Sequence, residues 1–193
     1  MRDITFGTGE YYHVYVRGVD KRNMFMDDVD RRRFLATMQK ANIIDDQCRV
    51  AIISFVLMSN HIHLLLRHER SDGVPAFMQR LHNSYAKYFN KRHDREGHLC
   101  SSKYKAKHID SDAYFLHLTR YIHKNPLSLR GVTSRTLEEY RWSSYRHYLG
   151  FERQPFVDAE AVLGDFKEQG SYRAFMNIRL HNDVIEPYLF NEE

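Results

Sequence analysis

Residues 57–66 read Leu-Met-Ser-Asn-His-Ile-His-Leu-Leu-Leu, and the rest of the chain is organised around this stretch. It joins two apolar runs, residues 50–58 and 62–66, by a polar Ser-Asn corner. A short corner between two apolar strands predicts that they pair antiparallel inside a sheet. Because side chains alternate across a strand, His61 and His63 are expected on one face and Ile62 on the other. Two neighbouring imidazoles are either half of a metal site or an ordinary packing pair, and the spacing alone leaves both interpretations open.

Hydrophobic periodicity on both sides of this stretch predicts strands alternating with helices. Strands are expected at residues 11–17, 49–57, 61–67 and 104–109, and helices at about 27–44, 75–92 and 112–125. The order β-α-β-β-α-β, followed by a further helix, is the split βαβ or ferredoxin-like arrangement of the α+β class. It predicts an antiparallel sheet with two helices on one face. This fold serves many activities and does not by itself indicate one.

Length and composition exclude several classes of protein. A chain of 193 residues can bury a full hydrophobic core. Its apolar runs are too short to cross a bilayer, and the first residues lack the apolar core of a secretion signal. Cys48 and Cys100 stand alone, without a paired motif. We therefore expect no membrane partner and a cytoplasmic location.

The net charge of +4 hides a basic middle segment. Residues 78–108 hold eight basic residues against two acids, with tyrosine and phenylalanine interleaved. A solvated helix face would explain the charge, but the aromatics favour nucleic acid, because they can stack on unpaired bases. The residues predicted to contact DNA are Arg80, Lys87, Lys91, Arg92, Lys103, Tyr104, Lys105 and Lys107.

The helix expected at residues 112–125 supplies what the two histidines lack. Tyr121 and Asn125 are four residues apart and therefore share one helical face. A phenol can attack a phosphate and form a covalent phosphotyrosine, and an amide oxygen can join two imidazoles around Mg²⁺ or Mn²⁺. Tyr121 could instead be a core residue, and Tyr114 and Tyr85 are rival phenols that spacing does not exclude.

Most of the chain resembles one family of enzymes. The His-Ile-His motif is similar to that of the HUH endonuclease superfamily, and within it the chain resembles the single-tyrosine transposases, above all the REP-associated tyrosine transposases. The shared blocks are Tyr-His-Val-Tyr-Val-Arg-Gly at residues 12–18, Asp-Arg at 30–31, Phe-Leu at 34–35, the whole stretch 57–66, Ser-Tyr at 84–85, Tyr-Phe-Asn at 88–90, Gly-His-Leu at 97–99, Tyr-Lys-Ala at 104–106, Arg-Tyr-Ile at 120–122, Asn-Pro at 125–126 and Trp-Ser-Ser-Tyr at 142–145.

This resemblance implies an HUH-type catalytic domain at residues 1–150, with a C-terminal helical extension at 151–193 packed on it. It implies a single-stranded DNA endonuclease and strand transferase that acts near hairpins formed by palindromic repeats in a prokaryote. The family's nucleophile falls on Tyr121, and its metal ligands fall on His61, His63 and Asn125. The implied cofactor is Mg²⁺ or Mn²⁺, and the implied state is a monomer or weak dimer.

Two other functions stay open from the sequence. The first is a domesticated protein that binds DNA hairpins without turnover. The second is a metal-independent RNase that uses the two histidines as acid and base.

Overall fold

A computed structural model describes residues 4–101, 103–166 and 169–178 of the chain. Its centre is a four-stranded antiparallel sheet with the order β4-β5-β1-β6. The strands are β1 (Tyr11–Arg17), β4 (Val50–Leu57), β5 (His61–His68) and β6 (Lys105–Ile109). The long helices are α1 (Asp28–Asn42), α2 (Gly73–Arg92) and α3 (Asp112–Lys124). The predicted α+β, ferredoxin-like sheet is thus confirmed. No helix among the described residues has the length and apolarity needed to cross a membrane.

Strand β5 lies in the interior of the sheet and decides what each face carries. The side chains of Ile62, Leu64 and Leu66 point to one face, where α1 and α2 pack, and all three are buried. The side chains of His61 and His63 point to the other face. Each strand that pairs with β5 follows the same alternation, because residues opposite one another in a ladder share a face.

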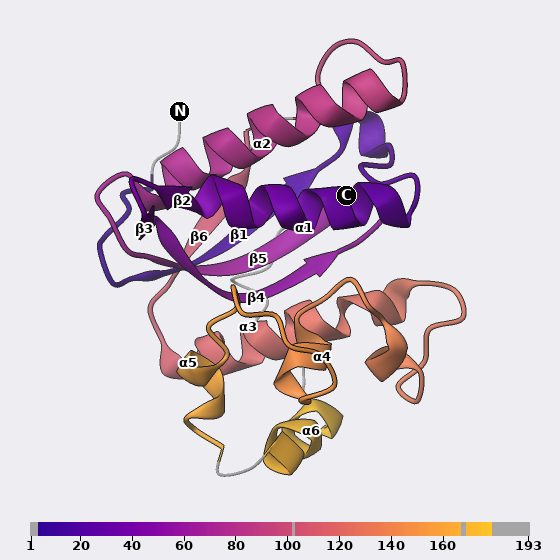
Figure 1. Ribbon diagram of the computed structural model, residues 1–193. Coiled ribbons are helices and arrows are strands. Elements are labelled where there is room, and N and C mark those ends of the chain that lie inside the picture. Colours follow the sequence, from indigo (N-terminus) through magenta and orange to yellow (C-terminus); the bar gives the residue numbers. More distant parts are fainter. Residues whose placement is uncertain (1–3, 102, 167–168, 179–193) are drawn as a thin grey trace.

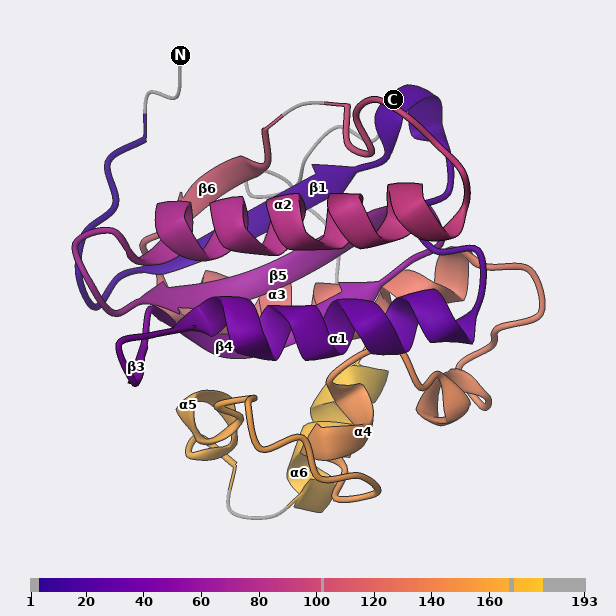
Figure 2. The ribbon, with the colours of Figure 1, turned by 45° about the horizontal axis from the view of Figure 1, so that its top comes forward.

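Helix α3 and the C-terminal segment cover the face that carries the histidines, as Figures 1 and 2 show. Helices therefore flank both faces of the sheet, and the expectation of helices on one face holds only for α1 and α2. The reason is apolar surface. Leu65 and Val56 lie on the histidine face, and their burial requires a second cover, which Phe115 and Leu118 of α3 help to provide.

The C-terminal segment, meaning the described residues from 129 onward, consists of short elements. They are the 3₁₀ helix Leu137–Glu139 and the helices α4 (Tyr145–Tyr148), α5 (Glu160–Leu163) and α6 (Gln169–Asn177). Two further 3₁₀ helices lie earlier in the chain, Val19–Lys21 after β1 and Asn125–Ser128 after α3. The segment hydrogen-bonds along the outer edge of β4, where Leu57 N donates to Trp142 O and Asp158 N donates to Ile52 O. Covering an edge strand in this way removes a site of aggregation.

A buried histidine ties this segment to α3. The ring of His123 contacts the Tyr172 hydroxyl through Nδ1 at 2.7 Å and the Ser144 Oγ through Nε2 at 2.8 Å. Burial lowers the pKa of His123 to about 3, so the ring stays neutral at physiological pH. The predicted domain boundary near residue 150 stays a prediction, although Val157, Val162 and Tyr172 belong to the same hydrophobic core as the sheet.

Helix α1 ends two residues earlier than predicted. The chain turns after Asn42 into a small hairpin of β2 (Ile43–Ile44) and β3 (Gln47–Cys48). Asp45 and Asp46 at its tip both have positive φ, at 49° and 56°, which is the geometry that hairpin turns require and that aspartate tolerates. The helical periodicity of the sequence did not reveal this turn.

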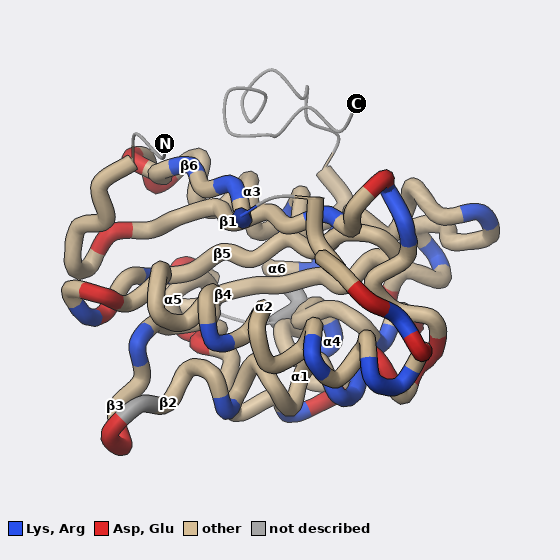
Figure 3. Tube along the Cα trace, turned by 90° about the horizontal axis from the view of Figure 1, so that it is seen from above, with Lys and Arg blue, Asp and Glu red and all other residues tan. Residues whose placement is uncertain are grey.

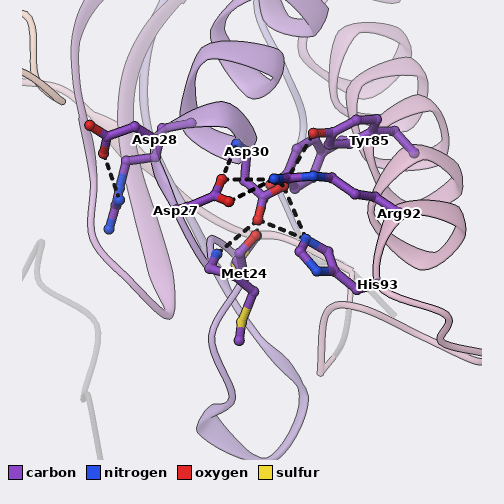
Figure 4. A network of polar contacts seen from close by, with 10 residues as sticks. Met24, Asp27, Asp28, Asp30, Tyr85, Arg92 and His93 are labelled. Atoms are coloured by element: carbon purple, nitrogen blue, oxygen red, sulfur yellow. Dashed lines mark hydrogen bonds and ion pairs between the residues drawn. The ribbon is translucent and has the colours of Figure 1, made fainter.

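An ion-pair cluster fastens the start of α1 to the end of α2 (Figure 4). Asp30 is fully buried, and its carboxylate accepts hydrogen bonds from Met26 N, Tyr88 Oη and Arg92, with His93 Nε2 also in contact at 2.9 Å. Arg92 also pairs with Asp27, whose side chain caps α1 by accepting from Asp30 N. Despite the cost of burial, these hydrogen bonds lower the pKa of Asp30 and keep it ionised.

The N-terminus of α2 is capped by a strand residue. The side chain of the preceding Asp72 makes no capping hydrogen bond. Instead, Val74 N donates to Nδ1 of the buried His68 at 3.1 Å. The two groups approach closely because the residue between Asp72 and Val74 is Gly73, where a Cβ would lie 2.8 Å from the same Nδ1. Burial lowers the pKa of His68, and the negative charges of Asp72 and Glu69 offset this only in part.

We expect this cap to make the free energy of unfolding decrease as the pH is lowered through the mildly acidic range. An imidazole whose folded-state pKa lies below its unfolded value of about 6.5 stabilises the fold above that pH, and this contribution is lost as the pH falls. Protonation would also remove the Nδ1 lone pair that accepts from Val74 N. The free energy of unfolding, measured by urea denaturation, should decrease between about pH 7 and pH 5. His68 contributes at most about 1.4 kcal/mol per pH unit to this decrease.

The matched control is His68→Asn, whose amide oxygen can accept from Val74 N but does not titrate. This variant should be less stable than the wild type at neutral pH and should show a flatter pH dependence. An unchanged slope would mean that other groups cause the decline.

Candidate active site

His61 and His63 lie side by side on the face of β5 that α3 covers. Their ring centroids are 5.2 Å apart and their planes are perpendicular. His63 is fully buried, while His61 keeps 8% of its surface exposed. The predicted sharing of one face is therefore confirmed, and the pair sits at the border between the core and the solvent.

The end of α3 brings the amide and the phenol to this pair. Asn125 directly follows the last residue of α3 and keeps helical backbone angles, so its side chain stacks one turn beyond Tyr121. Asn125 Oδ1 lies 3.2 Å from His61 Nε2. The half-buried ring of Tyr121 stands edge-on to His63, with centroids 5.5 Å apart. Residues about 60 positions apart in the sequence thus meet in one cluster.

The distance between two donor atoms of this cluster fits a shared divalent cation. Two ligands of one octahedral Mg²⁺, each about 2.1 Å from the ion, are separated by about 3 Å, close to the distance between His61 Nε2 and Asn125 Oδ1. No group of three His, Cys, Asp or Glu side chains in the described ranges could hold a metal ion, so a third donor must be of another type. An amide oxygen is such a donor. The assignment of His61, His63 and Asn125 as ligands stays a prediction.

The cluster also contains two strand residues that the sequence reasoning missed. His13 of β1 is fully buried, and its Nε2 lies 2.9 Å from His63 Nδ1. Tyr15 packs against both histidines, with centroid distances of 5.7 Å to His61 and 4.9 Å to His63. The signal was present in the alternating strand 11–17, whose odd positions face the same way once β1 is paired with β5.

The rival phenols lie elsewhere. Tyr85 is buried between α1 and α2, on the opposite face of the sheet, and its hydroxyl donates to Met24 O at 2.8 Å. Burial raises the pKa of Tyr85 well above its usual range. Tyr114 is on α3 but two turns before Tyr121. Neither tyrosine shares the geometry that places Tyr121 against His63.

The predicted DNA-binding residues divide into separate groups. Lys105 and Lys107 of β6 pair with Tyr15 and His13 of β1, so they extend the histidine face toward the free edge of the sheet. Burial, with the charge of Lys105, lowers the pKa of Lys107. Lys103 is exposed in the preceding loop and lines a crevice of about 440 Å³ beside α2.

The basic residues of α2 lie on the far side of the sheet from the histidines. Arg80, Lys87 and Lys91 are exposed on one side of this helix. Arg80 lines a crevice of about 130 Å³ between α1 and α2, together with Arg33 and Lys40. Figure 3 shows basic positions both along β6 and over the helical layer. The basic segment of the sequence does not form a single surface, because strand and helix residues in it end up on opposite faces.

Two residues of the predicted DNA-binding set make contacts inside the protein. Arg92 is paired with the carboxylates of Asp27 and Asp30, which neutralise its charge and fix its position. Tyr104 is 6% exposed and packs into the core near His82, so its ring does not offer a stacking surface. These contacts give each residue a role within the fold, and its assignment to DNA binding stays a prediction. A sequence reading cannot separate a surface cation from one that holds a buried acid, nor an exposed tyrosine from a core one.

Comparisons with known proteins agree with this architecture. A family model described as "Transposase IS200 like" matches residues 8–125, from three residues before β1 to Asn125. Among solved structures, a REP-associated tyrosine transposase bound to a REP hairpin superposes with a TM-score of 0.62 at 12% identity, over 81% of this chain and 88% of that one. This likeness shows a shared fold. A protein assigned as a transposase from Deinococcus radiodurans R1 gives a TM-score of 0.42 at 16% identity, over 64% of this chain and 96% of that one. A search of curated proteins gives no match.

If the cluster binds a divalent cation, His61→Ala and His63→Ala should each weaken Mn²⁺ binding at least tenfold, which corresponds to about 1.4 kcal/mol. Isothermal titration calorimetry without DNA measures this directly. His108→Ala is the control, because His108 lies on β6 with its ring directed to Glu10, away from the cluster. Wild-type affinity in both cluster variants would refute the metal site.

Proposed function

The chain belongs to the IS200-like transposase family, and from this premise we propose that it cuts and rejoins single-stranded DNA through a covalent bond to Tyr121. One observation carries the proposal. A half-buried phenol stands against His63 while Asn125, one turn further along the same helix, contacts His61. Packing alone does not require a tyrosine, an asparagine and two histidines to meet in this way.

In the proposed reaction, the hydroxyl of Tyr121 loses its proton and attacks a backbone phosphorus. A bond forms between Tyr121 Oη and phosphorus, and the bond from phosphorus to the 3′ oxygen breaks. The DNA is left with a free 3′-hydroxyl on one side and a 5′-phosphotyrosine on the other. Attack by a 3′-hydroxyl on the phosphotyrosine reverses the step and rejoins a strand. Because the phosphodiester energy is conserved in the covalent bond, rejoining needs no other energy source.

The side chains around Tyr121 fit this chemistry. A phenol has a pKa of about 10 and is a weak nucleophile at neutral pH, so the charge that develops on the phosphate must be stabilised. We assign this role to a Mg²⁺ or Mn²⁺ ion held by His61, His63 and Asn125, which would act as a Lewis acid when bound. The position of Tyr121 on the last turns of α3, packed on the sheet through Leu118 and Ile122, limits its motion relative to these ligands.

The basic groups would then contact different parts of the DNA. Lys105 and Lys107 lie on the histidine face, where they can hold phosphates of the single strand near the reacting one. Arg80, Lys87 and Lys91 are on the other side of the sheet and can reach only more distant DNA. The solved transposase that shares this fold is bound to a hairpin. We propose that a hairpin is also the substrate here, with cleavage in an adjacent single-stranded segment.

The proposal predicts that Tyr121, and no other tyrosine, becomes joined to DNA. Wild-type protein incubated with a hairpin that carries a single-stranded 5′ extension, in Mg²⁺ or Mn²⁺, should yield a protein–DNA adduct that survives denaturing electrophoresis. Tyr121→Phe removes one oxygen atom and should abolish the adduct, while folding and hairpin binding change little. EDTA should also abolish it.

Tyr114→Phe is the matched control on the same helix, and it should still form the adduct. An adduct in Tyr121→Phe would reassign the nucleophile. Hairpin binding with no adduct in the wild type would indicate a binding protein without turnover. Cleavage of RNA that resists both EDTA and Tyr121→Phe would indicate a metal-independent histidine nuclease.

Salt dependence tests the two lysines of β6. If both contact phosphates, the logarithm of the affinity for single-stranded DNA should fall with the logarithm of the salt concentration, and the variant with Lys105→Glu and Lys107→Glu should lose roughly 0.7 of slope per contact. Fluorescence anisotropy with a labelled oligonucleotide measures both slopes. Arg70→Glu with Arg153→Glu is the control, since it changes the net charge equally at two exposed loop positions outside β6. Equal slopes in the two double variants would show that the β6 lysines make no specific contact.

A further inference from the structure

Both candidate ligand imidazoles are held by a neighbouring side chain at the same ring nitrogen. Asn60 Oδ1 lies 2.7 Å from His61 Nδ1. His13 Nε2 lies 2.9 Å from His63 Nδ1. In each ring the Nδ1 atom is thus engaged by another side chain of the protein. A neutral imidazole has one proton to place, so the partner at Nδ1 decides whether Nε2 offers a hydrogen or a lone pair.

The orientation of the Asn60 amide is set independently of His61. Its Nδ2 donates to the carbonyl oxygen of Lys21 at 3.1 Å, which leaves Oδ1, an acceptor without a hydrogen, facing the ring. His61 Nδ1 must therefore carry the proton. Nε2 then presents its lone pair toward Asn125 Oδ1, 3.2 Å away. Two acceptor atoms directed at each other in this way suit a cation between them.

The loop after β1 holds Asn60 in place. Gly18 N donates to Asn60 O, and Met24 N donates to the carbonyl of the preceding Ser59. Lys21, whose carbonyl fixes the amide, has a φ of 58°, a left-handed conformation that few residues of its type adopt. Such strain persists where the surroundings determine it, and it is common at functional sites. A Cβ at Gly18 would lie 2.1 Å from Arg22 O, so only glycine permits this tight turn.

His13 is equally constrained on the other side of the site. It is fully buried in β1, and its ring plane makes an angle of 24° with that of His63, so the two rings are nearly coplanar across the nitrogen–nitrogen contact. Only one of the two facing nitrogens can donate the hydrogen bond. With Nε2 of His63 serving as a ligand, Nδ1 of His63 is the donor and His13 Nε2 is the acceptor.

We propose that Asn60 and His13 are positioning residues, which hold His61 and His63 in the Nδ1–H tautomer so that both Nε2 lone pairs face one cation. The tautomer of His61 follows from the contacts alone, while the tautomer of His63 and the role of both lone pairs rest on the proposed function. Partners of this kind fix ring orientation and tautomer at metal sites, and their loss typically weakens metal binding 10- to 100-fold.

The first experiment reads the tautomers directly in the metal-free protein. Long-range ¹⁵N–¹H NMR spectra of ¹⁵N-histidine-labelled protein distinguish Nδ1–H from Nε2–H rings, and His61→Ala and His63→Ala assign the signals. Both rings should show the Nδ1–H pattern in the wild type. Asn60→Leu should shift His61 alone toward Nε2–H, and His13→Phe should shift His63 alone. An Nε2–H pattern for either ring in the wild type would overturn the proposal for that ring.

The second experiment measures Mn²⁺ affinity by calorimetry at a temperature where all variants are folded. Asn60→Leu and His13→Phe should bind 10- to 100-fold more weakly than the wild type. Asn60→Asp and His13→Gln, which restore an acceptor at the same place, should recover most of the affinity. The control is His68→Phe, which replaces a buried imidazole on the opposite face of β5 and should bind Mn²⁺ like the wild type.

The outcomes separate this inference from the proposed function. If His61→Ala loses Mn²⁺ while Asn60→Leu and His13→Phe retain it, the positioning role is refuted and the metal site stands. If the wild type binds no Mn²⁺, the metal site falls and the positioning role falls with it. If His68→Phe weakens binding as much as His13→Phe, loss of stability explains the effect and the proposal is overturned.

Discussion

The two-residue period of β5 is the constraint on which the rest of the structure depends. An interior strand must bury both of its faces, and in β5 one face is aliphatic while the other begins with His61 and His63. Helices α1 and α2 cover the aliphatic face. The histidine face needs a different cover, one that buries Leu65 and His63 while His61 keeps a small part of its surface exposed. Helix α3 provides it, and by lying there it brings Tyr121 and Asn125 to the histidines.

Buried polar groups connect the elements that form this scaffold. An unpaired polar group in a core is costly, so each of the main ones has a partner on another element. Asp30 joins α1 to α2 through Arg92 and His93. His123 joins α3 to the C-terminal segment, and His68 joins β5 to the start of α2. Hydrogen bonds require defined distances and directions, so these contacts help to fix the positions of the helices relative to the sheet and to the site.

The division of the molecule into two faces gives the proposed chemistry its geometry. The reacting groups lie on one side of the sheet with the lysines of β6, and the cations of α2 lie on the other. A substrate held on both sides must pass around the sheet, which a folded DNA with a single-stranded segment can do. Membership of the IS200-like transposase family supports this interpretation.

The sequence alone determined the order of the elements and one half of the site. Alternation placed His61 and His63 together, helical spacing placed Tyr121 with Asn125, and both are local patterns that need no knowledge of distant contacts. Only the tertiary structure showed that α3 lies on the histidine face, and that His13 and Asn60 contact the two rings. It alone showed that Arg92 serves a buried carboxylate and that Tyr104 belongs to the core. The physical reason is that burial and partnership depend on which surfaces meet, and segments far apart in the chain decide that together.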